Sequence, residues 1–396
     1  MNPTPDFSFN NTEIAFQDKS NSDLKKARLL FSTFNYKWLL KVGPSLARFG
    51  LRSGLPVKGL IKDTIFAQFC GGESIRDCAE TIERLNHAKI GTILDYSVEG
   101  QELETTFDHT CEEIIQTIEK AAEARDSIPF SVFKVTGIAA FNVLKNAAKG
   151  AEQLSGKEAE AFERVQARFD KITQKAYERK VRLFIDAEET WIQDTIDRMT
   201  EVAAEKFNKE EAIIYNTLQM YRHDRLAYLQ QMIDKANQGN YKLGFKLVRG
   251  AYMEKERLRA AKLGYPSPIQ KDKASSDRDF DAALRLSLSH ADTVSICAGT
   301  HNEQSCKLLT ELMAEKSMHA SDKRVYFAQL LGMSDHISYN LAHAGYNVAK
   351  YVPYGPVKEV LPYLTRRAEE NSSVAGQAGR ELSLIEKELK RRTTSS

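Results

Sequence analysis

Short apolar runs rich in β-branched and aromatic residues recur along the chain from about residue 90, separated by longer charged segments. Several runs are apolar at successive positions, as in Leu183-Phe184-Ile185, and this pattern is typical of a strand buried on both faces of a parallel sheet. We therefore predict eight short strands at residues 92–96, 131–135, 181–185, 212–217, 244–248, 293–297, 324–327 and 346–351.

The segments between these runs have helical periodicity. The clearest are residues 152–180, 190–208 and 303–316, the last with Leu308, Leu309, Leu312 and Met313 at helical spacing among charges. Strands that alternate with helices predict a parallel sheet with right-handed crossovers, and eight such units close a barrel. The competing architecture is an open doubly wound sheet, but its GxGxxG fingerprint does not occur in the sequence. We predict an α/β fold of the (β/α)8 TIM-barrel type.

The two ends of the chain have different patterns. Residues 1–90 show loop and helix signals without strands, so we predict an N-terminal helical region (1–90), a barrel (91–380) and a basic C-terminal tail (381–396). Residues 36–62 contain six basic and no acidic residues among apolar ones. This stretch is interpreted either as a pair of helices that pack on the main domain, which we favour, or as a surface that binds anionic membranes.

Charge and cysteine content narrow the class of protein. The chain has 56 basic and 54 acidic residues, without the clustered basic excess that nucleic-acid binding requires. Its five cysteines form no CxxC pair, which suits a reducing compartment. We see neither a signal or transit pattern nor an apolar run of about 18 residues, so we expect a cytoplasmic protein without a membrane span.

Polar residues gather where the predicted strands end, which is where barrel enzymes carry their chemistry. Any one of them is commonly a cap or a loop contact, and Glu188 and Glu189 are interpreted that way. Seven of the eight strands nevertheless end on such residues: Lys134, Asp186, Gln219, Arg249 with Gly250 and Tyr252, Thr300 with His301, Gln329, and Tyr351.

Residues 357–371 predict a helix with two stripes. Val357, Val360, Leu361, Leu364 and Ala368 form an apolar stripe, and Tyr363, Arg366, Arg367 and Glu370 form a polar one beside it. The polar stripe is either a solvated face with an Arg366–Glu370 pair or a fork of two guanidinium groups suited to a small carboxylate.

Single residues would also suit two other chemistries. Lys134 would suit a Schiff-base nucleophile of an aldolase-type barrel. His301 would suit a metal ligand, but His301 and Asp186 have no third partner at a recognisable spacing, so we predict no metal site.

Six motifs occur in the order found in one family: FIDAEE (184–189), LVRGAYMEKER (247–257), GTHN (299–302), QLLGM (329–333), KYVPYGPV (350–357) and RRAEENSS (366–373). Together they cover about residues 90–375, and the chain closely resembles the proline dehydrogenases. It is similar to their monofunctional form and to the corresponding domain of bifunctional proline utilisation A. From the length of 396 residues we expect no second, aldehyde dehydrogenase domain.

The resemblance implies non-covalent FAD in a distorted barrel and L-proline as the substrate. It implies that Arg366, Arg367 and Lys134 hold the proline carboxylate and that Glu370 orients the arginines and the flavin edge. Tyr351 would pack beside the ring, and Tyr363 and Leu331 would close the pocket. Relatives that prefer hydroxyproline have a smaller residue at the position of Tyr351, so we expect a preference for proline.

The resemblance also implies a cofactor-binding set. Lys246 and Arg249 would approach the isoalloxazine and the phosphates, although these two basic residue types are exchanged relative to the bifunctional relatives. Gly250 and Ala251 would let the backbone approach the flavin closely. The remaining members of this set are Asp186, Gln219, Tyr252, Thr300, His301, Asn302, Gln329 and Glu370.

The implied reaction transfers a hydride from C5 of proline to flavin N5, giving Δ1-pyrroline-5-carboxylate, with electrons passed to ubiquinone or menaquinone. A peripheral contact with the inner face of the plasma membrane would accompany that acceptor. Two alternatives stay open. One is a flavin-dependent barrel reductase of the methylenetetrahydrofolate reductase type, and the other is a non-enzymatic binding protein that keeps only the scaffold.

Overall fold

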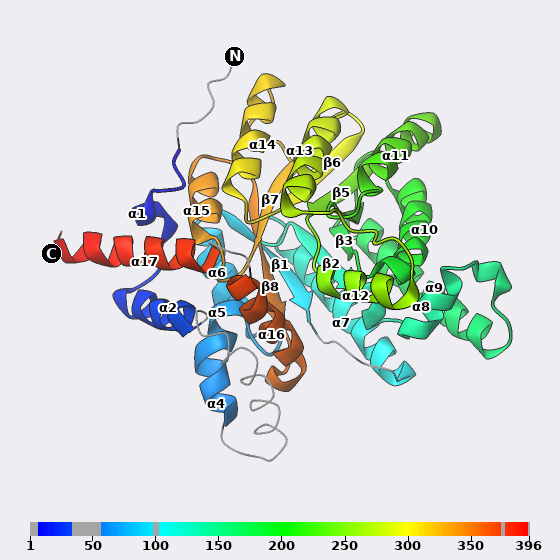
Figure 1. Cartoon of the computed structure of the whole chain (residues 1–396), viewed down its shortest axis with the longest axis horizontal. Coiled ribbons are helices and arrows are strands. Elements are labelled where there is room, and N and C mark those ends of the chain that lie inside the picture. The colour runs from blue at the N-terminus through cyan, green and yellow to red at the C-terminus, as the bar shows by residue number, and fades with distance from the viewer. Residues whose placement is uncertain (1–6, 34–56, 98–102, 374–376, 395–396) are drawn as a thin grey trace. The chain divides into compact units, whose positions relative to one another are not determined.

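The computed structural model describes residues 7–33, 57–97, 103–373 and 377–394 (Figure 1). Within these ranges the side chains of Val57, Leu60, 368–373, 377 and 378 are not described. Most of the basic stretch at residues 36–62, interpreted either as a pair of packing helices or as a membrane-binding surface, therefore lies outside the described residues.

Eight parallel strands form a closed barrel in the order β1 to β8. The predicted strands and the (β/α)8 barrel are confirmed, with boundaries shifted by a few residues. Tyr351 is not the last residue of its strand, because β8 continues through Pro353 to Tyr354. The strands are β1 Ile90–Tyr96, β2 Phe130–Lys134, β3 Arg182–Asp186, β4 Ile214–Gln219, β5 Leu243–Val248, β6 Val294–Gly299, β7 Val325–Leu330 and β8 Val348–Tyr354.

The chain divides into two compact units, and the limits of these units differ from the domain limits predicted from the sequence. The first comprises residues 1–4 and 100–328, and the second residues 5–99 and 329–396. Strands β2 to β6 belong to the first unit, whereas β1 and β8 belong to the second, where they pair in parallel from Ile90–Val348 to Tyr96–Tyr354. The predicted limits at residues 90 and 380 stay a prediction.

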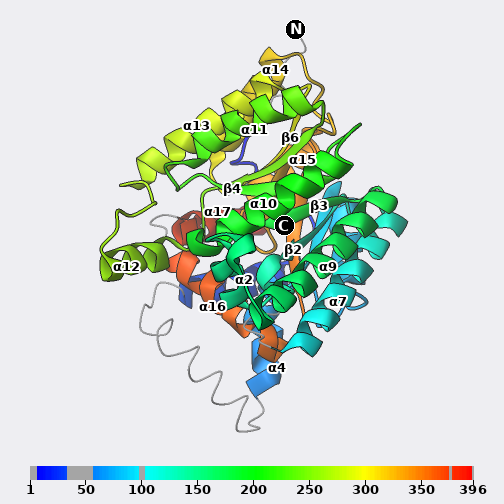
Figure 2. The same cartoon turned by 90° about the vertical axis from the view of Figure 1, so that its right-hand side faces the viewer.

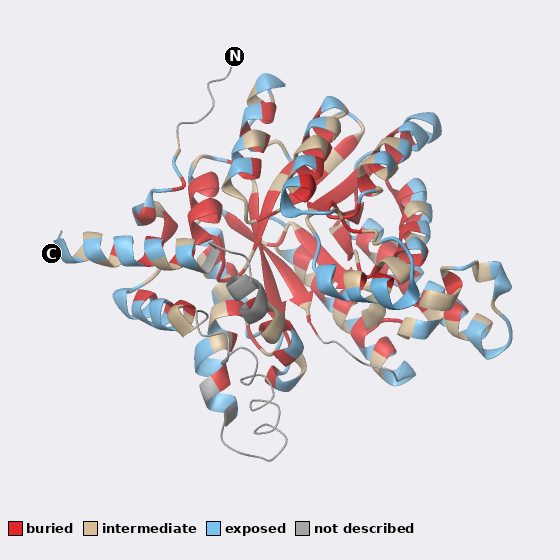
Figure 3. Cartoon of the chain, in the orientation of Figure 1, coloured by how far each residue is buried: buried red, intermediate tan, exposed pale blue. Residues whose placement is uncertain are grey.

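In the first unit, helices pack on the outside of the strands (Figures 1 and 2). The predicted helix 152–180 begins later, at Lys157, because its N-cap residue Gly156 has a φ of +53°, outside the right-handed helical region. Figure 3 shows the strands as mostly buried. Phe130 of one strand stacks on Phe184 of the next, with ring centroids 4.3 Å apart. The helices are α7 Glu104–Glu123, α8 Phe141–Ala147, α9 Lys157–Glu178, α10 Thr190–Phe207, α11 Arg225–Gly239, α12 Met253–Leu263, α13 Lys273–Ser289 and α14 Glu303–Glu315.

The second unit joins the terminal segments. Helix α17, Gln377–Thr394, packs against α2, Asn21–Thr33, and against α1, Thr12–Ala15 (Figure 1). Leu384 and Ile385 of α17 are buried in a core shared with Phe31 and Val360. The residues predicted to be a basic tail therefore form a helix with a buried face. The other helices are α4 Val57–Ile61, a π-helical turn Lys62–Phe66, α5 Ala67–Phe69, α6 Ala79–His87, α15 Asp335–His343 and α16 Val357–Ser373.

Among the described helices, we find none with both the length and the apolar composition needed to cross a bilayer.

Candidate active site

Three charged side chains meet at the carboxyl ends of the first unit's strands. Lys134 ends β2 and Asp186 ends β3, and the two residues are directly paired in register. Lys134 Nζ donates a hydrogen bond of 3.2 Å to Asp186 Oδ2, and Lys246 on β5 donates to Asp186 Oδ1. The site predictions for these residues are brought together here as one Lys–Asp–Lys cluster.

The Asp186 carboxylate stays ionised in this cluster. Burial alone would raise its pKa, but the positive charges of Lys246 and Lys134 and their hydrogen bonds outweigh burial and hold the pKa below its usual value. One carboxylate thus accepts hydrogen bonds from two ammonium groups. Lysine ammonium groups at the ends of barrel strands are groups to which an anionic ligand can bind.

Glu188 and Glu189 contact neighbouring segments, which agrees with their interpretation as loop-end residues. Glu188 accepts hydrogen bonds from the backbone N–H and the hydroxyl of Thr136, and Glu189 accepts from Lys255 of α12. Burial raises the pKa of Glu188 to about 7, against the opposing effect of the Thr136 hydrogen bonds. This carboxyl group therefore titrates near neutral pH.

Arg249, directly after β5, is held by three side chains. Its Nε donates to Asp277 (2.6 Å), Nη1 to the hydroxyl of Thr300 (2.7 Å) and Nη2 to the hydroxyl of Ser305 (3.0 Å). The guanidinium also lies 4.4 Å from the ring centroid of Phe280. Two of its three acceptors are neutral hydroxyls, and the third, Asp277, also forms an ion pair with Lys273.

The backbone after Arg249 takes a course that requires glycine. Gly250 has a φ of +133°, and a Cβ at this position would lie 2.5 Å from the ring of Tyr221. Gln219 at the end of β4 donates to the carbonyl of Glu188 (2.7 Å) and accepts a long hydrogen bond from the Ala251 N–H (3.4 Å). The side chain of Gln219, at the end of β4, is thus linked to the backbone that follows β5.

The remaining predicted cofactor residues of the first unit have local roles as well. Asn302 caps α14, because its side-chain oxygen accepts from the N–H groups of Gln304 and Ser305. Tyr252 precedes α12, and Thr300 is buried whereas His301 is half-buried. Since the Asn302 side chain is engaged in the cap, its predicted flavin contact would need its other polar atoms or the backbone.

Helix α16 in the second unit has the two predicted stripes. Val357, Val360, Leu361 and Leu364 are buried, as expected for the apolar stripe. In the other stripe, Arg367 is buried and its guanidinium carbon lies 5.1 Å from the ring centroid of Tyr363. Arg366 is half-buried. The side chains of Ala368 and Glu370 lie outside the described residues, so the predicted Arg366–Glu370 pair and the role of Glu370 stay predictions.

Tyr351 and Leu331, also in the second unit, are neighbours. The N–H of Leu331 donates to the carbonyl of Tyr351 (2.8 Å), and both side chains are buried. Gln329, predicted to bind the cofactor, accepts a hydrogen bond of 2.8 Å from the hydroxyl of Ser338. The joint use of these residues with Lys134 of the first unit stays a prediction.

The site predicted from the sequence does not include several residues that hold its side chains in place. Asp277 and Ser305 hold Arg249, but they come from α13 and α14, and no spacing pattern connects them with residue 249. Lys350 is also absent from the predicted site. It lies within the motif at residues 350–357, but its buried contacts with the segment after β7 depend on the tertiary fold.

Comparisons with known proteins agree on one family. The family model described as proline dehydrogenase matches residues 78–380. The chain is 35% identical to the carbapenem antibiotics biosynthesis protein CarD of Pectobacterium carotovorum, over 85% of this chain and 86% of that protein. It is 34% identical to proline dehydrogenase 1, mitochondrial, of Dictyostelium discoideum, over 85% of this chain and 66% of that protein.

Two further matches cover less of the other protein. The chain is 44% identical to human proline dehydrogenase 1, mitochondrial, over 58% of this chain and 39% of that protein. The crystal structure of proline utilization A from Bdellovibrio bacteriovorus matches with a TM-score of 0.75 at 17% identity, covering 96% of this chain and 44% of that one. At that identity the structural match shows the shared fold alone.

Proposed function

Because the chain belongs to the proline dehydrogenase family, we propose that it oxidises L-proline to Δ1-pyrroline-5-carboxylate with non-covalently bound FAD. The observation that carries this proposal is the group of three cationic side chains, Lys134, Lys246 and Arg249, toward the carboxyl ends of strands β2 and β5, where they contact Asp186 and Asp277. A substrate carboxylate and the phosphates of a dinucleotide are the anions that such a group would bind.

The residues present fit a flavin dinucleotide. Arg249 is fixed by three partners and so keeps its guanidinium in one orientation, and Gly250 has no side chain that would hinder a close ligand. Lys246, Gln219 and Thr300 add donors at the same strand ends. We propose that these five residues hold the cofactor. Bound FAD supplies the hydride acceptor, flavin N5, for the hydride that leaves C5 of proline.

Other side chains are proposed to bind the substrate and to exclude water from it. Arg366 and Arg367 would hold the substrate carboxylate by bidentate hydrogen bonds, with Lys134 as a third cation, so that binding energy sets the geometry of the ring. Tyr351, Tyr363 and Leu331 would exclude water around it. Proline must react as the neutral amine, and the surrounding cations lower the pKa of the bound ammonium group. No side chain is then needed as a strong base.

The proposed activity is tested by mixing the FAD-loaded protein with L-proline and a soluble quinone analogue. The cyclic imine product is trapped with o-aminobenzaldehyde and measured by its absorbance. We expect product to form in proportion to the protein, and an equal amount of quinone to be reduced. Proline-independent quinone reduction without trapped product would contradict the proposal.

We further propose a membrane quinone as the acceptor, with the protein peripheral on the cytoplasmic face of the membrane. The support is the basic composition of residues 36–62. Two of its six basic residues are already paired, because Lys58 and Lys62 each lie 3.0 Å from a carboxylate oxygen of Glu73. The other four basic residues of the stretch, Lys37, Lys41, Arg48 and Arg52, lie outside the described residues.

This division supplies a matched control. Changing Lys37, Lys41, Arg48 and Arg52 to Gln should reduce sedimentation with anionic phosphatidylglycerol vesicles at least fivefold, because each basic residue near such a surface contributes about 1 kcal/mol. Changing Lys58 and Lys62 to Gln should have a much smaller effect. Equal binding of both variants and the unchanged protein would exclude this segment as the membrane contact.

A further inference from the structure

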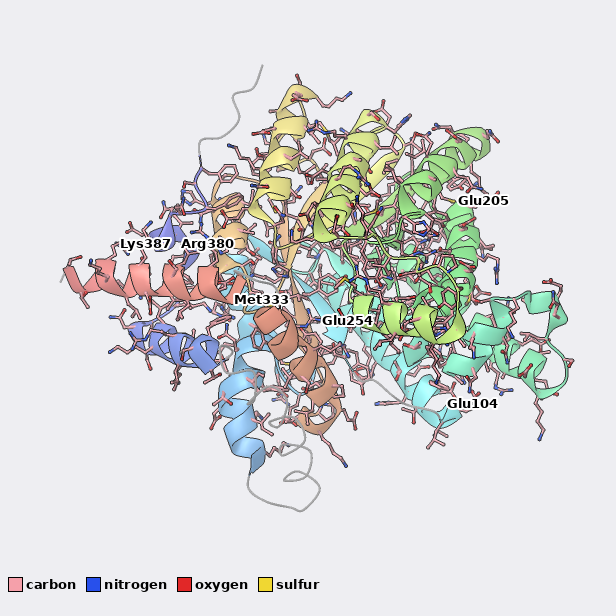
Figure 4. All side chains as sticks on the ribbon, viewed as in Figure 1. Glu104, Glu205, Glu254, Met333, Arg380 and Lys387 are labelled. Carbon is pink, nitrogen blue, oxygen red and sulfur yellow. The ribbon has the colours of Figure 1, made fainter. Side chains whose placement is uncertain are left out.

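Lys350 is a fully buried lysine in the middle of β8. Its ammonium group donates to the carbonyl oxygens of Leu330 (3.3 Å) and Met333 (2.5 Å) and to Asp335 Oδ1 (2.8 Å). All three acceptors lie within residues 330–335, which we call the β7–α15 loop; Figure 4 labels Met333 in it. One side chain of β8 thus fixes both ends of this loop.

Other parts of the second unit hold the same loop. Gln68 donates to the carbonyl of Gly332 (2.9 Å), and Gly332 has a φ of +73°, so that a Cβ there would lie 2.1 Å from the Gln68 carbonyl oxygen. The Ser334 N–H donates to Glu381 of α17, and Lys19 forms an ion pair of 3.1 Å with Asp335. The loop is therefore fixed in one conformation from several sides.

The loop carries Leu331, whose N–H donates to the carbonyl of Tyr351. Lys350 and Tyr351 are successive residues of a strand, so their side chains leave the strand on opposite faces. Lys350 therefore does not lie on the face of β8 from which Tyr351 would contact a ligand. Any influence of Lys350 on that ligand must pass through the loop or through the backbone of β8.

Stability alone does not account for a lysine at this position. Burial lowers the pKa of Lys350 against the attraction of Asp335, which means that desolvation of the ammonium group is costly here. An apolar residue would avoid this cost on a strand whose other residues are all buried. What an apolar residue cannot do is bind two loop carbonyls at once.

We propose that Lys350 is a positioning residue for the substrate pocket: through the β7–α15 loop it holds Leu331 against Tyr351 and so limits the pocket to an unsubstituted five-membered ring. This inference rests on the proposed function, because it assigns the pocket to L-proline. Asp335 is the counter-charge that keeps Lys350 directed at the loop, and Lys19 stabilises Asp335 from the other side.

The test compares the full-length, FAD-loaded protein with its Lys350→Met variant, using L-proline and trans-4-hydroxy-L-proline. We expect the proline KM of the variant to rise at least fivefold while kcat per bound flavin changes less than twofold. The ratio of kcat/KM for proline to that for hydroxyproline should fall at least threefold, because a displaced Leu331 leaves room for the hydroxyl group.

A matched control is Glu388→Gln, which also removes a buried charge from the second unit but breaks contacts with Arg391 and Arg392, remote in sequence from the loop. It should lower the melting temperature without changing KM or the substrate ratio. If Lys350→Met does not fold, Asp335→Asn preserves the side-chain shape and should shift KM and the ratio in the same direction.

The outcomes separate the two claims. A wild-type protein that oxidises proline, with KM and ratio unchanged within twofold in Lys350→Met, or in Asp335→Asn where that variant replaces it, overturns the positioning role alone. A wild-type protein that retains FAD but does not oxidise proline overturns the proposed function and this inference with it.

Discussion

Lys246 donates a hydrogen bond to the buried carboxylate of Asp186, and this contact joins strands β5 and β3, between which β4 lies in the barrel. Asp186 also pairs with Lys134 on β2. One carboxylate therefore contacts lysines from two strands at the edge of the barrel. The two lysines differ in exposure, since 6% of the Lys246 side chain is exposed and 23% of the Lys134 side chain.

This difference predicts separate roles. Lys246→Met should lower stability by about 3–5 kcal/mol, because it removes the more buried partner of Asp186. Lys134→Met should cost less in stability, since Asp186 keeps its contact with Lys246, and should mainly raise the proline KM. Thermal unfolding and steady-state kinetics of both variants check this. Equal losses of stability would contradict the assignment of Lys246 as the structural partner.

Glu188 predicts a pH dependence of stability. Its folded-state pKa of about 7 lies above the ordinary value of 4.5, so between these values the folded protein keeps a proton that the unfolded chain has lost. Its contribution to stability is therefore present at low pH and lost as the pH rises to 7, with a slope of at most about 1.4 kcal/mol per pH unit.

The check is the melting temperature of wild type and Glu188→Gln from pH 5 to pH 8. The Gln variant cannot ionise, so the difference, wild type minus variant, should be most favourable to wild type at pH 5 and should decrease steadily to about pH 7.5. A constant difference across this range would mean that Glu188 is not protonated in the folded protein at pH 5–6.

The contacts of Arg249 predict that FAD binding requires a guanidinium group at this position. Arg249→Lys keeps the charge but cannot reach Asp277, Thr300 and Ser305 together, so the FAD dissociation constant should rise at least tenfold. FAD fluorescence in equilibrium dialysis measures it. Arg324→Lys is the control, because Arg324 precedes β7 and binds Asp322. Retained FAD affinity in Arg249→Lys would remove Arg249 from the cofactor site.

Arg367 predicts a loss of substrate binding. Arg367→Met keeps an apolar contact with Tyr363 but removes the guanidinium, so the proline KM should rise by well over tenfold, since an unpaired buried carboxylate costs about 2 kcal/mol or more. The matched control is Arg380→Met, which removes the hydrogen bond from Arg380 to the Asn10 side chain. A near-normal KM in Arg367→Met would exclude Arg367 from the pocket.

The (β/α)8 barrel could be predicted because its strands and helices depend on local patterns. Runs such as Leu183-Phe184-Ile185 carry their own strand signal, and eight of them with helices between allow few topologies. The boundaries were less predictable. The last strand was predicted to end at residue 351, but β8 continues through Pro353, whose carbonyl accepts a hydrogen bond from the Gly71 N–H, to Tyr354.

The site could be predicted only in part. Lys134, Asp186 and Arg249 lie at strand ends, which can be located from the sequence, and their predicted roles come from the resemblance to the family. The partners that fix them come from distant segments: Asp277 and Ser305 lie 28 and 56 residues beyond Arg249. Such contacts are set by helix packing on the barrel, and a single sequence carries no signal for them.

The most direct test of the central claim is an anaerobic titration of the FAD-loaded protein with L-proline, followed by flavin absorbance near its visible maximum. The proposed function predicts that the absorbance bleaches with proline and that NADH in place of proline has no such effect. A flavin that ignores proline but bleaches with NADH would contradict it and favour a reductase of the methylenetetrahydrofolate type.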